Sequence, residues 1–170
     1  IFQDLRYSRV FDQISKRFDD FSPNPLYEIG FERVQGRSFR IDGQNQVDSL
    51  LRGTEQAAVR FAVTADRCDK LMKRLPSRNR TFFRDNLAAQ CRYMEKLNRA
   101  LYCFVRAYKQ PETRIHDLDQ AIGYLEQARD ALYATQEGIF STWYAGDAAN
   151  GKFNIPAKLE MLQILRKNQR

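Results

Sequence analysis

The amino-acid sequence predicts an all-α fold: an up-down antiparallel bundle of three long helices, with additional helices at the N- and C-terminal ends. Three observations support this expectation. Apolar residues recur every three or four positions over long segments, which is the spacing of one face of a helix. Prolines separate these segments, and proline ends a helix because it has no backbone N–H to donate. Strict alternation of apolar and polar residues, the mark of a strand, is confined to the short segment 38–42.

The composition is that of a globular protein. Of the 170 residues, 28 are Lys or Arg and 21 are Asp or Glu, which gives a net charge of +7, and 43% are hydrophobic. The apolar content excludes disorder, and the lack of any long uncharged run excludes a membrane span, so no membrane partner is expected. We expect one helical domain over residues 1–170. Because the chain begins at Ile1 within an amphipathic pattern, we also expect it to be a fragment of a longer chain.

The first helix is predicted over residues 2–21, where apolar residues follow helical spacing. Pro23 and Pro25 end it. The pattern is then irregular near residues 22–45 and contains three glycines. A connection of this length is uncommon in a compact domain and is often functional, so this loop is a candidate site.

Three long helices follow, and each is ended by a proline or a glycine. We expect them over residues 47–75, 77–108 and 115–132. Pro76 and Pro111 end the first two, and Gly138 stands where a C-terminal glycine cap of the third belongs. The turns at Pro76 and Pro111 are only a few residues long, so the helices that they join must run antiparallel. The expected core contains Phe61, Leu71, Leu87, Met94, Leu101, Ile122 and Leu125.

A second irregular segment, near residues 139–156, is rich in aromatic residues. We expect it to be ordered, with Trp143 partly buried and Asp147 accepting hydrogen bonds in a turn or cap. Asn154 and Pro156 predict the start of the last helix, with asparagine as its N-cap and proline in its first turn.

The three cysteines, Cys68, Cys91 and Cys103, are widely spaced and have apolar neighbours. We expect all three to be buried free thiols. The chain has no C-x-x-C motif and only one histidine, so no metal site and no cofactor are expected. The lack of a disulfide framework favours a reducing, cytoplasmic compartment.

Catalytic residues are hard to find in this chain. His116 is the only candidate base for a nucleophile, and beside Asp117 and Asp119 in a first helical turn we expect it to be exposed and not catalytic. Glycoside hydrolysis needs two nearby carboxylates. Asp42 and Asp147 lie in the two irregular loops and are the better candidates, although a role in a turn is the favoured alternative.

Positive charge is concentrated between residues 66 and 84, a segment that contains seven basic residues and two acidic ones. We call this segment, residues 67–84, the basic knob, because it straddles the turn at Pro76 and so lies at one end of the bundle. Its cations could bind the phosphates of a nucleic acid. The favoured alternative is that these cations complement helix dipoles, because no aromatic residue lies among them before Phe82. The candidate phosphate contacts are Lys73, Arg74, Arg78 and Arg80.

Four segments carry a resemblance: R-I-D-G-Q-N at 40–45, L-L-R-G-T-E at 50–55, W-Y-A-G-D at 143–147 and F-N-I at 153–155. Together they are similar to the helical region that follows the catalytic domain in some large bacterial glycoside hydrolases. The W-Y-x-G-D element is the most specific. The resemblance implies a non-catalytic accessory domain that packs against another domain of the same parent chain, with the catalytic acids outside this chain. The candidate interface or carbohydrate contacts are Trp143, Tyr144, Asp147, Arg40, Asp42 and Asn45.

Two function classes therefore remain open. The first is an accessory, structural domain of a larger carbohydrate-active hydrolase. The second is an independent module that binds nucleic acid or a protein through the basic knob. The adjacent aromatic residues Trp143 and Tyr144 could serve as a sugar platform, an interdomain anchor or a simple staple of their own loop.

Overall fold

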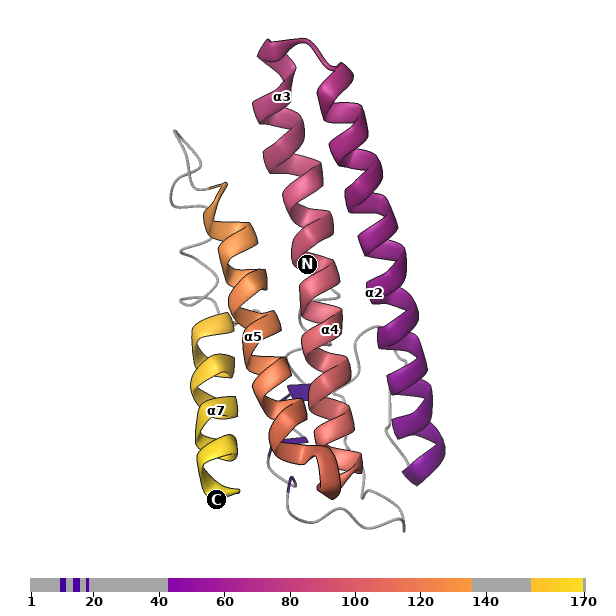
Figure 1. Ribbon diagram of the computed structural model, residues 1–170, viewed down its shortest axis with the longest axis vertical. Coiled ribbons are helices and arrows are strands. Elements are labelled where there is room, and N and C mark those ends of the chain that lie inside the picture. Colours follow the sequence, from indigo (N-terminus) through magenta and orange to yellow (C-terminus); the bar gives the residue numbers. More distant parts are fainter. Residues whose placement is uncertain (1–9, 12–13, 16–17, 19–42, 136–153, 170) are drawn as a thin grey trace, which may run out of the picture.

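The computed structural model describes residues 10–11, 14–15, 18, 43–135 and 154–169, and every regular element among them is helical (Figure 1). The α-helices are α2 (Gly43–Arg74), α3 (Ser77–Phe83), α4 (Ala89–Lys109), α5 (Arg114–Tyr133) and α7 (Ile155–Asn168). A π-helical turn, Arg84–Ala88, joins α3 to α4, and a 3₁₀ turn, Pro111–Thr113, leads into α5. The predicted all-α bundle is confirmed. None of the described helices is both long and apolar enough to cross a membrane.

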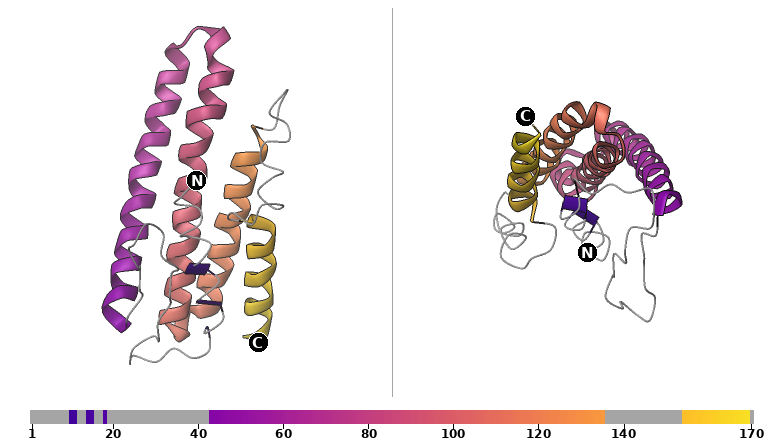
Figure 2. Two further views of the ribbon diagram at one scale, coloured as in Figure 1. Left: turned by 180° about the vertical axis from the view of Figure 1, so that it is seen from behind. Right: turned by 90° about the horizontal axis from the view of Figure 1, so that it is seen from below.

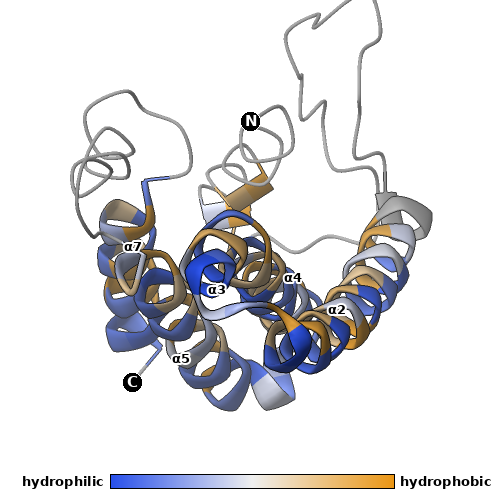
Figure 3. Ribbon diagram, turned by 90° about the horizontal axis from the view of Figure 1, so that it is seen from above, coloured by the Kyte–Doolittle hydropathy of each residue, from blue (hydrophilic) through white to orange (hydrophobic). Residues whose placement is uncertain are grey.

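Helix α4 is central in the arrangement. It packs against α2 on one side and α5 on the other, and α7 packs on the far side of α5 (Figure 1). Viewed from below, the four helices form one curved layer, with the described N-terminal residues inside the curve (Figure 2). Hydrophilic residues of α5 and α7 lie on the outer side of this layer (Figure 3).

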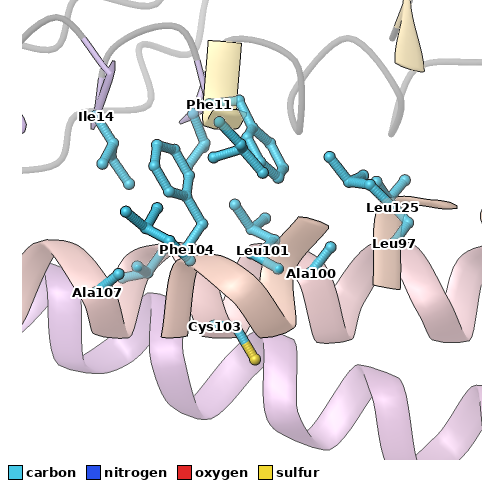
Figure 4. Packing of buried hydrophobic residues seen from close by; sticks show 14 of the residues in the cluster. Phe11, Ile14, Leu97, Ala100, Leu101, Cys103, Phe104, Ala107 and Leu125 are labelled. Atoms are coloured by element: carbon cyan, nitrogen blue, oxygen red, sulfur yellow. The ribbon is translucent and has the colours of Figure 1, made fainter. Parts of the chain in front are cut away.

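The core lies between α4, α5 and the N-terminal residues. The apolar side chains of Val10, Phe11, Ile14 and Phe18 are buried, as the helical spacing predicts. The ring of Phe11 stacks on that of Phe104 with centroids 4.9 Å apart (Figure 4). The ring of Phe18 stacks on Phe104 as well, with centroids 5.6 Å apart. Such aromatic pairs add to the free energy gained from burying their area.

The expected core is correct in part. Leu101 and Leu125 are fully buried, and Met94 and Ile122 are partly buried and pack against the main core. Phe61 is only partly buried. The expectation is wrong for Leu71 and Leu87, which are 49% and 45% exposed. Both belong to a part of α2 and α3–α4 that extends beyond α5, where none of the other described helices packs over the apolar face (Figure 1).

The helix ends follow their local signals in most places. Helices α2 and α4 end just before Pro76 and Pro111, as predicted. Asn154 caps α7, because its side-chain Oδ1 accepts a hydrogen bond from Ala157 N at 3.2 Å. The prediction of Gly138 as the cap of α5 is wrong: the helix ends at Tyr133.

The carbonyl of Leu132, near the end of α5, is satisfied locally. The hydroxyl of Thr135 donates to it at 2.7 Å and the backbone N–H of Thr135 at 3.0 Å. A threonine placed three residues on thus supplies the donors at this helix end, and a glycine cap is not needed.

Candidate functional site

The basic knob lies on a helical hairpin. We define the hairpin as residues 63–92, which comprise the outer part of α2, α3, the π-helical turn and the start of α4. Its outer end extends beyond α5 and α7 (Figure 1). A small cluster of Ala65, Cys68, Ala88 and Cys91, with Phe83 packed against it, holds the two arms together. This cluster is separate from the main core, so the hairpin has its own apolar seam.

The turn of the hairpin is fixed by an arginine. The Nε of Arg80 donates to the carbonyl of Leu75 at 2.9 Å, and its Nη2 donates to that of Lys73 at 3.4 Å. Carbonyls at the end of a helix lack intrahelical partners, and a cationic side chain satisfies them well. Arg80 therefore caps α2, as the dipole alternative for the basic knob predicted.

The four candidate phosphate contacts come together at the outer end of the hairpin. Lys73, Arg74, Arg78 and Arg80 are all exposed there. Within the described part of the chain, no ion pair engages Lys73, Arg74 or Arg78. Three of the four cations thus remain available to an anionic partner.

A surface pocket of about 450 Å³ opens between the arms of the hairpin, and it is lined by Asp69, Met72, Lys73, Arg80, Thr81 and Arg84. The two carboxylates near it are held by cations. Asp69 accepts a hydrogen bond from Arg92, which joins α2 to α4, and Arg84 Nε lies 2.6 Å from Asp85 Oδ1. The Oδ1 atom of Asp69 is buried and has no hydrogen-bond partner. The positive charge of the pocket therefore comes mainly from Lys73 and from Arg80, which is hydrogen-bonded to neutral carbonyls and keeps its full charge.

Apolar side chains are also exposed on the hairpin. Phe82 is 71% exposed, and Val63, Leu71 and Leu87 are also exposed on the hairpin. The apolar spacing of the sequence placed Phe82 on the apolar stripe of its helix and predicted Leu71 and Leu87 to be core residues. Their exposure depends on how far the hairpin extends beyond α5, and helical spacing holds no signal for that.

Most of the other predicted contacts cannot be placed. Trp143, Tyr144, Asp147, Arg40 and Asp42 lie outside the described residues. Asn45 was predicted to lie in the irregular loop, which is wrong, because its backbone belongs to the first turn of α2. His116 is exposed near the start of α5, as expected.

The cysteines are free and buried, as predicted. Burial raises the pKa of Cys103 to about 11, although the positive charge of Arg106 opposes the rise. Within the described ranges, no group of three or more His, Cys, Asp or Glu side chains could hold a metal ion.

Comparison with protein families, curated proteins and solved structures found no match to this chain. The resemblance to the helical region of glycoside hydrolases therefore stays a prediction.

Proposed function

We propose that this chain is a non-catalytic interaction domain that binds an acidic protein surface through the outer end of its hairpin. One observation carries the proposal: the exposed ring of Phe82 lies on the same hairpin end as the unpaired cations Lys73, Arg74 and Arg78. Arginine and aromatic side chains are enriched at the centres of protein interfaces, and exposed apolar side chains near one another mark interaction sites.

The apolar side chains favour a protein over a nucleic acid. Leu71, Phe82 and Leu87 gain free energy only when a partner covers them with apolar surface, at about 25 cal/mol per Å². A phosphate backbone offers no such surface. The surrounding cations then speed association and select an acidic partner, which is the usual contribution of charge at an interface.

The resemblance of the segments at 40–45, 50–55, 143–147 and 153–155 supports a more specific form of this proposal. In that form the partner is another domain of the same parent chain, a carbohydrate-active hydrolase, and this domain is accessory to it. Carbohydrate contact through the loop near residues 139–156 belongs to the same proposal.

A specific observation also favours a second candidate function, binding of single-stranded nucleic acid. Phe82 is exposed two residues from both Arg80 and Arg84, so an aromatic ring does lie among the cations. Bases stack on such rings while arginines contact phosphates.

Three fluorescent probes of equal length separate the two candidates: a peptide alternating Glu with Leu and Phe, poly-glutamate, and a single-stranded oligonucleotide. We expect the amphipathic peptide to bind most tightly by fluorescence anisotropy. Combined Lys73→Glu, Arg74→Glu and Arg78→Glu substitutions should weaken it more than tenfold. Phe82→Ala should weaken this peptide about tenfold and leave poly-glutamate unchanged.

The matched control reverses three exposed charges outside the hairpin, Arg52, Arg60 and Lys167, and should leave peptide binding nearly unchanged. Equal losses in both triple variants would show that net charge alone is responsible and would contradict the proposal. Tightest binding of the oligonucleotide, with a steep loss of affinity as salt rises, would establish the second candidate instead.

A further inference from the structure

We propose that Cys68 and Cys91 form a reversible disulfide bond that fastens the two arms of the hairpin. This inference does not depend on the proposed function. Both cysteines are buried in the same small cluster, Cys68 on α2 and Cys91 on α4. The two side chains are neighbours within this cluster, and Cys68 is near enough to affect the Cys91 thiol.

The residues around the pair bring the two helices together at the level of the cysteines. Ala65 and Ala88 complete the cluster, and such small side chains let the two helices approach closely. Asp69 and Arg92, each the next residue after one of the cysteines, form an ion pair across the same seam. The ion pair fixes the register of α2 against α4 at the level of the cysteines.

The position of the bond gives it a mechanical role. It would link residues on either side of the basic knob, the Pro76 turn and the π-helical turn. This outer part of the fold packs on α2 and α4 and lacks the support that α5 gives to the main core. A cross-link across a closed loop restricts the unfolded state, so it would suppress opening of the hairpin.

The oxidant we name is a small disulfide such as oxidised glutathione. The thiolate of one cysteine attacks it, forms a mixed disulfide and releases one glutathione thiolate. The second cysteine then attacks the mixed disulfide through its own thiolate and releases the second glutathione. Two cysteine thiols and one glutathione disulfide thus yield one protein disulfide and two glutathione thiols, which take up both protons.

The rate of this exchange depends on hairpin opening. Burial and the neighbouring Cys68 raise the pKa of Cys91, which keeps it protonated in the closed hairpin. Cys103 provides an internal control, because it is as buried as Cys68 but its Sγ donates to Gln120 Oε1 at 3.6 Å. It should remain a free thiol.

The test equilibrates the full chain with mixtures of reduced and oxidised glutathione, followed by acid quench and mass spectrometry. Under oxidising mixtures we expect the mass of the chain to fall by two hydrogens and the number of titratable thiols to fall from three to one. A non-reducing tryptic digest should show the peptides of Cys68 and Cys91 joined. Cys103→Ala should keep the bond, and Cys68→Ala or Cys91→Ala should abolish it.

The mechanical role is measured by the rate of tryptic cleavage at the exposed Arg78 and Arg80. We expect cleavage in the oxidised chain to be several-fold slower than in the reduced chain, and Cys68→Ala to remove the difference. Three free thiols in fully oxidising glutathione, or a bond that includes Cys103, would overturn the pairing. A Cys68–Cys91 bond with no change in cleavage rate would overturn its role as a fastener.

Discussion

Arg106 holds the fully buried carboxylate of Asp117 where α4 and α5 meet. Its Nε donates to Asp117 Oδ1 at 2.9 Å, and its Nη2 donates to the same oxygen. The hydroxyl of Thr113 donates to Oδ2 at 2.7 Å, and the Arg106 guanidinium lies over the ring of Tyr102. The bond to Asp117 raises the pKa of Arg106 further above its ordinary value. The guanidinium of Arg106 therefore stays charged at ordinary pH, and its bonds to Asp117 fix the turn between the two helices.

Asp117→Ala should lower the free energy of unfolding by about 3 kcal/mol, because it leaves Arg106 without its buried partner. Urea denaturation followed by circular dichroism measures the change. The matched control is Asp130→Ala, which removes an aspartate of α5 that is 65% exposed and paired with Arg129. We expect the control to cost less than about 0.5 kcal/mol. Equal costs for the two variants would contradict a stabilising role for the buried pair.

Leu101→Ala should cost about 2–5 kcal/mol, because Leu101 is fully buried in the main core and its truncation leaves a cavity. Leu71→Ala removes the same atoms from an exposed position on the hairpin and should cost less than about 0.5 kcal/mol. The two unfolding midpoints in urea give the comparison. A large loss for Leu71→Ala would mean that the outer arm of the hairpin is covered in solution.

These two leucines also show how far sequence reasoning reaches. Both lie on the apolar stripe of a helix, and helical spacing predicted each helix correctly, but it also predicted burial at both positions and is right only for Leu101. Burial further requires a second helix on that face and a third element over it, and this depends on how long the neighbouring helices are. Leu101 has α5 and the N-terminal residues beside it, whereas Leu71 lies beyond α5.

The candidate site was predictable to a similar degree. The charge of the basic knob and its position at one end of the bundle follow from the residues flanking Pro76. The capping of α2 by Arg80 does not, because it depends on the path of the turn that brings Arg80 back to the carbonyl of Leu75. The exposure of Phe82 likewise depends on the length of the hairpin.

Asn154→Ala should lower the free energy of unfolding by about 1 kcal/mol, since it removes the acceptor for Ala157 N at the start of α7. Asn154 also has a φ of 50°, in the left-handed region that alanine adopts with strain. Asn154→Gly loses the same acceptor but relieves the strain, so it should cost only a few tenths of a kcal/mol. Thermal melting of both variants gives the order, and a glycine variant less stable than the alanine variant would refute the cap.

Above pH 9, part of the pH dependence of stability should come from Cys103. Burial raises the pKa of its thiol from 9.0 to about 11 in the folded chain. Between these values the unfolded chain loses the proton and the folded chain keeps it, so the free energy of unfolding falls as pH rises. A shift of two pKa units corresponds to about 2–3 kcal/mol of stability, and this contribution is fully lost only above pH 11.

Urea titrations at pH 8 and 10.5 measure the loss of unfolding free energy between the two pH values. This loss should be smaller by about 2 kcal/mol in Cys103→Ala than in the unsubstituted chain. Leu101→Ala, a truncation on the same helix without a thiol, should keep the original loss, and an unchanged loss in Cys103→Ala would assign the alkaline decline to other groups.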